Sequence, residues 1–84
     1  MNDLYDLFAL RIITDTIPQC YELLGLIHNR YTPVPKRFKD YIALPKPNAY
    51  QSLHTTILGM LQDHRRLPTE IQLRTLAMHK QAEI

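Results

Sequence analysis

The stretch from residue 33 to residue 49 constrains the fold more than any other part of the chain, because it holds four of the six prolines. Proline lacks an amide hydrogen and fixes its own φ, so neither a long helix nor a central strand can run through this stretch. We expect an ordered, irregular loop with at most one short helical turn, in which the prolines lower the conformational entropy. Its cations are Lys36, Arg37, Lys39 and Lys46, and its expected apolar anchors are Phe38, Tyr41, Ile42 and Leu44.

The segment before this loop predicts a strand followed by a helix. Residues 4–14 are dense in apolar and β-branched side chains, and Leu7 to Leu10 show no alternation, which is typical of a strand covered on both faces. Asp15 and Thr16 offer N-cap oxygens, and Pro18 suits the first helical turn. The helix that follows should have an apolar stripe formed by Cys20, Leu23, Leu24, Ile27, His28 and Tyr31, and it should end before Pro33.

The segment after the loop predicts two strands and a second helix. From residue 50 to residue 59 polar positions alternate with apolar ones, so that one face presents Tyr50, Ser52, His54 and Thr56. Residues 69–75 alternate in the same way, and their polar face presents Glu70, Gln72 and Arg74. We expect a solvated hairpin loop over residues 60–68 and a helix from Leu76. The order of elements indicates an α/β (α+β) fold with a mixed sheet and flanking helices, truncated at both ends.

Composition excludes several classes of protein. With 84 residues the chain is one small domain or a piece of a larger one, and a net charge of +2 is too weak to indicate nucleic-acid binding. The longest apolar run is four residues, which excludes a transmembrane helix, and Asp3 and Asp6 stand where a signal peptide would need apolar residues. A single cysteine, Cys20, excludes an internal disulfide, and no Cys/His spacing fits zinc. We therefore expect a cytoplasmic protein.

The two polar strand faces are the first candidate for chemistry. If the strands at residues 50–59 and 69–75 form a hairpin, their polar side chains make one wet surface, although a solvent-exposed sheet face has the same pattern. Asp6 and Glu70 could meet on neighbouring strands and hold Mg²⁺ through their oxygens. The alternative makes Asp6 a solvated residue at a strand edge and Glu70 a partner in a cross-strand salt bridge.

The loop and its neighbours offer a second set of candidates. Its four cations could clamp a polyphosphate, or they could be a solvated basic surface. Tyr50 could stack on a nucleobase or serve as a packed anchor. His54 could donate to a phosphate or ribose oxygen, although an isolated strand histidine is usually structural. His28 should pack in the core, whereas His64 and His79 should be solvated, and no chemistry is expected of Cys20.

The string from Phe38 to Thr56, FKDYIALPKPNAYQSLHTT, closely resembles the synthetase domain of the RelA/SpoT family, which makes guanosine tetra- and pentaphosphate. Three further segments agree with this resemblance, in the family's order. Residues 6–12 resemble the metal-binding strand, residues 70–75 the second acidic strand, and residues 78–83 the helix after it. The resemblance therefore covers nearly the whole chain, and it favours the functional interpretation of each candidate.

The resemblance implies a nucleotidyltransferase-like fold and transfer of pyrophosphate from ATP to the ribose 3′-hydroxyl of GTP or GDP. It implies that Asp6 and Glu70 are catalytic Mg²⁺ ligands, and that Glu70 also serves as the base for the 3′-hydroxyl. Tyr50 would stack on guanine, while Gln72 and Arg74 would lie on the catalytic face. The remaining contacts to the guanosine nucleotide would come from Lys39, Lys46, Asn48 and His54. Ribosome contact or oligomer formation would involve other domains, and no membrane or direct nucleic-acid contact is expected of this segment.

Three departures from the family pattern qualify these expectations. Ala49 stands where the family usually has glycine, so it would be strained if the site needs a positive φ. The hairpin between Gly59 and Thr69 looks longer than the usual short turn, which should alter only a surface loop. The basic, serine-containing ATP segment of the family precedes the metal strand and is missing, so we expect the 84 residues alone to be inactive.

Two other functions stay open at this point. The chain could be a catalytically inactive regulatory domain that binds guanine nucleotides, an interpretation that Ala49 and the truncated architecture favour. It could also be a basic fragment that binds nucleic acid, which would show a steep salt dependence of RNA binding.

Overall fold

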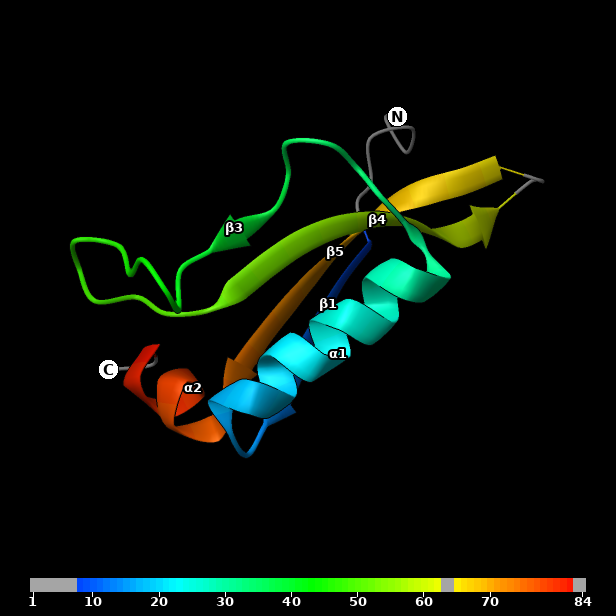
Figure 1. The fold of residues 1–84 in the computed structure, drawn as a ribbon. Helices are drawn as coiled ribbons and strands as arrows, with labels where there is room; N and C mark the ends of the chain where they lie inside the picture. Colours follow the sequence, from blue (N-terminus) through cyan, green and yellow to red (C-terminus); the bar gives the residue numbers. More distant parts are fainter. Residues whose placement is uncertain (1–7, 63–64, 83–84) are drawn as a thin grey trace.

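The computed structural model describes residues 8–62 and 65–82. Five strands form one mixed sheet in the order β1-β5-β4-β2, and β3 also pairs with β4. Strand β1 runs parallel to β5, and the other pairings are antiparallel. The expected α/β (α+β) fold is therefore confirmed (Figure 1). In chain order the elements are β1 (Phe8–Thr14), α1 (Ile17–Arg30), β2 (Thr32–Pro33), β3 (Lys39–Asp40), β4 (Leu53–Gln62), β5 (Arg65–Thr75) and α2 (Leu76–Ala82).

Helix α1 begins where the sequence predicts. The Thr16 hydroxyl accepts a hydrogen bond from the backbone N–H of Gln19 at 3.3 Å, and the Gln19 side chain accepts one from the N–H of Thr16 at 3.1 Å. This reciprocal capping box satisfies two amides that a helix start would otherwise leave unpaired. Pro18 lies in the first turn, where its missing amide hydrogen costs nothing. The helix ends at Arg30, before Pro33.

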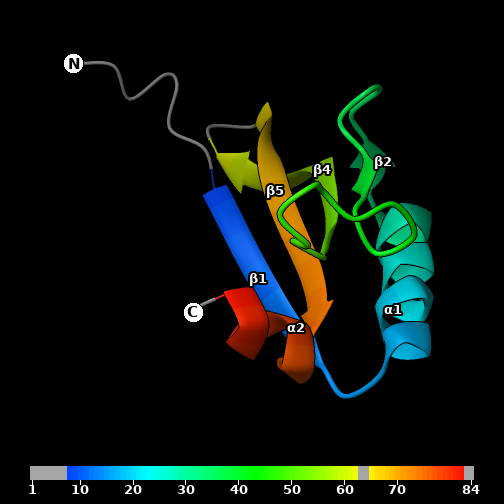
Figure 2. The ribbon, with the colours of Figure 1, turned by 90° about the vertical axis from the view of Figure 1, so that its left-hand side faces the viewer.

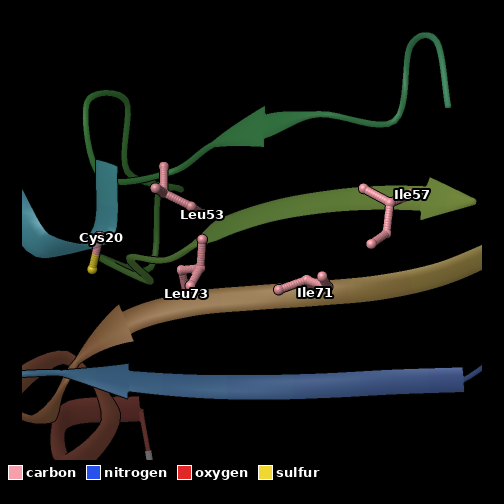
Figure 3. Packing of buried hydrophobic residues seen from close by; sticks show 5 residues of the cluster. All are labelled: Cys20, Leu53, Ile57, Ile71 and Leu73. Atoms are coloured by element: carbon pink, nitrogen blue, oxygen red, sulfur yellow. The ribbon is translucent and has the colours of Figure 1, made fainter. Parts of the chain in front are cut away.

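The core lies between α1 and one face of the sheet (Figure 2). Cys20 of α1 packs with Leu53 and Ile57 of β4 and with Ile71 and Leu73 of β5 (Figure 3). The half-buried residues that pack around this cluster are Ile12, Leu23, Leu24, Ile27 and Ile42.

The expectations for His28 and Cys20 fit this packing. His28 is half-buried, and its Nε2 lies 2.7 Å from the Thr55 hydroxyl of β4. Cys20 is fully buried, and its sulfur lies 3.1 Å from the Thr14 hydroxyl at the end of β1.

Strand β1 differs from the prediction of a strand covered on both faces. In the sheet order β1 stands at one end, beside β5, and over its described residues Leu10 stays 57% exposed. Apolar density alone does not separate a central strand from one at the margin, because an edge strand beside a small core can be equally apolar.

The predicted hairpin loop over residues 60–68 is also wrong. Strand β4 continues to Gln62 and β5 begins at Arg65, so the two strands stay paired as far as Gln62 opposite Arg65. A register shift between Leu58 and Met60 marks a bulge in this extension. Charged side chains led to the prediction of a loop, but backbone pairing needs no apolar side chains once a hairpin has formed.

Ser52 is a third difference. The sequence pattern put it on the polar face, yet it is fully buried and precedes β4. Its hydroxyl donates to the carbonyl of Leu73 at 3.3 Å, so it satisfies a backbone group beside the core.

The loop over residues 33–49 is irregular, as expected, and its regular parts are the two-residue strands β2 and β3. After β3 the chain makes a turn rather than a helix. Tyr41 and Ile42 are half-buried, but Leu44 is 78% exposed, so its predicted role as an anchor is wrong. Within the described residues, neither helix has the length and hydropathy needed to span a membrane.

Candidate functional site

The sheet face opposite the core gathers most of the predicted site residues. Along β5 the buried Ile71 and Leu73 alternate with the half-buried Glu70 and Gln72, so the two sets point to opposite faces. In the sheet register His54 pairs with both Lys39 of β3 and Gln72 of β5. Residues directly opposite one another in a ladder share a face. The fold therefore brings the two strands of the polar-face hypothesis together, and it adds β3 with Lys39 as a third segment.

Three rings form a cluster at the start of β4. The hydroxyl oxygen of Tyr50 lies 2.9 Å from Nε2 of His54, and their ring centroids are 5.7 Å apart. Tyr41 packs edge-on against both, with centroids 6.1 Å from Tyr50 and 5.4 Å from His54. Edge-to-face packing fixes the orientation of each ring. The sequence pattern indicates only a loop anchor at Tyr41, and nothing in it shows that the turn after β3 returns this ring to β4.

Two cations approach this aromatic cluster from different elements. The Lys46 ammonium lies 4.9 Å from the ring centroid of Tyr41 and 5.7 Å from that of Tyr50. The Arg74 guanidinium carbon lies 6.0 Å from the Tyr50 centroid. Such contacts stabilise a cation over a ring by about 0.5–2 kcal/mol, and they keep both positive charges at one place. A basic aromatic surface of this kind suits an anionic ligand that also carries a flat ring.

Arg74 is buried to an unusual degree for a cation, with 4% of its surface exposed. One of its terminal nitrogens lies 2.9 Å from Nδ1 of His79, and within the described part of the chain its Nε has no hydrogen-bond partner. A buried, partly unsatisfied guanidinium is costly unless something else compensates its charge. His79 is half-buried on α2, so the prediction that it is solvated is wrong. Because Arg74 lies on β5 and His79 on α2, no spacing rule within one element could have indicated this contact.

Burial lowers the pKa of His54 from its ordinary value of 6.5. The neighbouring Glu70 carboxylate acts in the opposite direction, while Lys46 and Arg74 lower the pKa further by repulsion. His54 is therefore neutral at neutral pH and can act as a hydrogen-bond donor or acceptor.

The loop between Lys46 and Tyr50 is a tight turn. The N–H of Ala49 donates to the carbonyl of Lys46 at 2.8 Å, and the N–H of Lys46 donates to the carbonyl of Tyr50 at 3.3 Å. The side-chain oxygen of Asn48 accepts from the N–H of Tyr50 at 3.1 Å. Ala49 has a φ of 68°, which is the left-handed conformation. The site therefore does need a positive φ at the position where the family usually has glycine. Asn48 therefore shapes the loop that presents Tyr50.

Two cavities adjoin these residues. One of about 290 Å³ lies between the tight turn and α2, and it is lined by Asn48, Ala49, Tyr50, Gln51, Met78, Gln81 and Ala82. A smaller one of about 130 Å³ is lined by Val34, Arg37, Thr56, Pro68 and Glu70. The larger cavity has a tyrosine in its wall, and the smaller one has both a cation and a carboxylate.

Glu70 is the predicted metal-site carboxylate that lies within the described residues. Asp6 lies outside the described residues, and within them no three His, Cys, Asp or Glu side chains gather as a metal cluster. Glu70 is half-buried and pairs in register with Ala9 of β1 and Thr56 of β4. Its carboxylate lines the smaller cavity and is the kind of oxygen ligand that Mg²⁺ prefers, so this one of the two predicted carboxylates fits that ion.

Two other predicted site residues lie opposite His54 on this face. Gln72 accepts a hydrogen bond from Nε of Arg11 on β1 at 3.3 Å. Lys39 is exposed on β3. All the predicted site residues within the described part, apart from Asn48 in its turn, thus lie on this sheet face or at its aromatic cluster.

Known proteins match this chain over nearly its whole length. A family model described as a region found in RelA / SpoT proteins matches residues 1–84. A GTP pyrophosphokinase of Myxococcus xanthus is 56% identical over 98% of this chain and 10% of its own length. A guanosine-3′,5′-bis(diphosphate) 3′-pyrophosphohydrolase of Aquifex aeolicus is 52% identical over 99% of this chain and 11% of its own length. The chain thus spans about a tenth of these curated relatives, whose names describe opposite reactions.

Solved structures agree with the fold. Small alarmone synthetase 1 of Bacillus subtilis, bound to its product pppGpp, superposes with a TM-score of 0.77 at 30% identity, over 89% of this chain and 41% of that one. Small alarmone synthetase 2 of the same organism gives a TM-score of 0.75 at 35% identity, over 89% of this chain and 42% of that one.

Proposed function

Because the chain belongs to the RelA/SpoT family, we propose that residues 1–84 are part of an alarmone synthetase domain and form the guanosine-nucleotide side of its active site. The reaction would transfer pyrophosphate from ATP to the 3′-hydroxyl of GTP or GDP. A cytoplasmic location belongs to the same proposal, since both nucleotides are abundant there and the single cysteine is a free thiol.

The observation that carries this proposal is the aromatic cluster with its two cations. Tyr50 forms part of the wall of the larger cavity, so its ring offers a stacking surface to a guanine base in that cavity. Lys46, held over the Tyr41 and Tyr50 rings, lies where it would meet the phosphates of the same nucleotide. A base and a phosphate chain need these two kinds of contact side by side, and a solvated sheet face would not bury Arg74 as well.

The remaining residues would position the phosphates and the reacting oxygen. Lys39 lies opposite His54, and neutral His54 would donate a hydrogen bond to a phosphate or ribose oxygen. Asn48 would support the nucleotide through the turn that it shapes. Gln72 and Arg74 would lie along the path between base and acceptor. Pyrophosphoryl transfer depends chiefly on such positioning and on charge neutralisation.

Glu70 has two roles in this proposal. With Asp6 it would hold Mg²⁺, and this ion when bound would neutralise phosphate charge. The Glu70 carboxylate would also accept the proton of the ribose 3′-hydroxyl, since it is half-buried on the same face as His54. Arg37 lines the cavity beside Glu70, where its charge would attract the phosphates.

A catalytically inactive domain that binds guanine nucleotides is the alternative. One of the two arguments for it was Ala49 in place of the usual glycine, which could have altered the turn. Ala49 keeps a φ of 68°, so the turn retains a conformation typical of glycine. This finding weakens the argument for an inactive domain. Synthesis assays of Glu70→Gln and the wild type test the alternative directly.

Calorimetric titration of the 84-residue chain with GDP tests the proposed binding. We expect Tyr50→Ala to weaken binding about tenfold or more, because one lost base stack costs about 1–3 kcal/mol. Tyr31→Ala is the matched control, since Tyr31 is an exposed tyrosine beyond the end of α1, and it should bind GDP like the wild type. Equal GDP affinity of Tyr50→Ala and wild type would disprove the stacking role.

A further inference from the structure

Asp40, at the end of β3, accepts hydrogen bonds from three different donors. The Tyr21 hydroxyl of α1 donates to both carboxylate oxygens, at 3.1 Å to Oδ1 and 2.8 Å to Oδ2. The backbone N–H groups of Ile42 and Ala43 donate to Oδ1 at 3.0 Å and 2.9 Å. All these donors are neutral, and bonds from neutral donors to a charged acceptor are stronger than bonds between two neutral groups. One carboxylate therefore joins a helix, a strand and a turn.

These bonds determine where the turn after β3 leads. The carbonyl of Asp40 accepts from the N–H of Leu44 at 3.2 Å, which closes the turn, and the N–H of Tyr41 donates to the carbonyl of Ser52 at 2.9 Å. The turn thereby holds the Tyr41 ring beside Tyr50 and His54. Lys46 follows directly and lies over the same Tyr41 ring.

The helix side of the contact is rigid. Tyr21 follows Cys20, which is fully buried in the core cluster, so the backbone that carries the Tyr21 ring has little freedom to move. The turn, in contrast, belongs to a long loop of mostly exposed residues whose ordering would otherwise cost entropy at each binding event. A loop that is ordered before the ligand arrives binds more tightly than one that must be ordered by it.

We propose that Tyr21 and Asp40 are positioning residues that set the affinity for the guanosine nucleotide, by fastening the turn over residues 40–44 to α1. This inference rests on the proposed function, and it assigns to both side chains a role that requires no contact with the nucleotide. Tyr41 and Lys46 would contact it, and the Tyr21–Asp40 pair would keep these two side chains in place.

Calorimetric titration with GDP of the 84-residue chain and four variants tests the proposal. We expect Asp40→Ala to weaken binding about tenfold and Tyr21→Phe about three- to fivefold, because the first removes all these bonds and the second only those from the hydroxyl. Asp40→Asn keeps a side-chain oxygen for the same donors and should restore most of the affinity. Tyr31→Phe, on a tyrosine of the same 38% exposure, should bind like the wild type.

Two further measurements separate a positioning role from general destabilisation. Adding Tyr21→Phe to Asp40→Ala should cause no further loss of affinity, because the two side chains act as one unit. Without nucleotide, Tyr21→Phe should speed hydrogen exchange at the amides of Ile42 and Ala43 and leave the amides of Thr55 and Ile71 in the sheet unchanged.

The outcomes distinguish this inference from the proposed function. If the wild type binds GDP and Asp40→Ala binds it equally well, the inference is wrong and the proposed function stands. If the wild type binds no GDP, the proposed function is wrong and the inferred role is wrong with it. Unchanged exchange at Ile42 and Ala43 in Tyr21→Phe would show that the hydroxyl does not fasten the turn, which also overturns the inference.

Discussion

Ala49 adopts a left-handed backbone conformation, with a φ of 68°, in the turn that presents Tyr50. A Cβ atom in this region meets the following carbonyl oxygen and costs about 1–2 kcal/mol, a cost that glycine avoids. The turn nevertheless persists, because Asn48 and Lys46 fix it by hydrogen bonds on both sides. The strain is therefore local and is compensated by its neighbours.

Replacing this residue should stabilise the chain. We expect Ala49→Gly to raise the free energy of unfolding by about 0.5–1 kcal/mol, since it removes the strain at the expense of some entropy in the unfolded chain. Urea unfolding monitored by circular dichroism measures the change. Ala43→Gly is the control, because Ala43 is not among the residues with positive φ, and it should lower stability or leave it unchanged. A loss of stability in Ala49→Gly would contradict the strain argument.

His54 should make the stability of the fold depend on pH. Its folded pKa lies below 6.5, so at mildly acidic pH the unfolded chain binds more protons at this position than the folded chain does. The stability that neutral His54 contributes to the fold is therefore complete above about pH 6.5, and it is lost as the pH falls through the folded pKa. We expect His54→Gln to lose less stability than the wild type between about pH 7.5 and about pH 5. An NMR titration of the His54 ring that gives a pKa above 6.5 would contradict this prediction.

At the scale of elements, helix α1 was predictable because its signals are local. Thr16, Gln19 and Pro18 fall within four positions of one another and fix the start of the helix without help from the rest of the fold. The extended pairing of β4 and β5 was not predictable in the same way. Arg65 and Arg66 resemble loop residues when read alone, and their place in a strand depends on a partner across the hairpin.

The helix start also allows a quantitative test. We expect Thr16→Ala to lower the free energy of unfolding by about 1 kcal/mol, because it leaves the N–H of Gln19 without its acceptor. Thr32→Ala, at an exposed threonine of β2, should change stability by less than about 0.5 kcal/mol. Urea unfolding of the two variants side by side makes the comparison. Equal values for the two would mean that the capping box does not contribute.

At the scale of the whole molecule, the site depends on contacts between distant parts of the chain. Arg11 and Gln72 are 61 positions apart and share a hydrogen bond, because β1 runs parallel to β5. Alternation along β5 predicted the polar face, and the family resemblance identified most of the residues on it. Neither could show that Tyr41 would join Tyr50, that His79 would meet Arg74, or that Ser52 would be buried. Each of those contacts depends on the path of an irregular loop or on the docking of α2.

Catalysis is the property that tests the assembled site. In a full-length protein that carries this segment, we expect Glu70→Gln to reduce synthesis of pentaphosphate from ATP and GTP at least about a hundredfold. GDP affinity of the same variant should change little, because the proposed contacts of the nucleotide lie mainly with Tyr50 and Lys46. Glu22→Gln, at an exposed carboxylate of α1, is the matched control. Thin-layer assay of the product measures synthesis, and wild-type rates in Glu70→Gln would remove the catalytic role of Glu70.

The far end of β5 has a consequence for how copies of this chain behave toward one another. Among the described residues, the register of β1 on β5 starts at Phe8 opposite Thr69, and the part of β5 before Thr69 includes Arg65, Arg66 and Pro68. Edge strands expose unpaired backbone groups and so promote aggregation. Two like charges and a proline oppose the pairing of a further strand. This end of β5 is therefore a poor site for pairing between the sheets of two copies, because it carries two like charges and a proline.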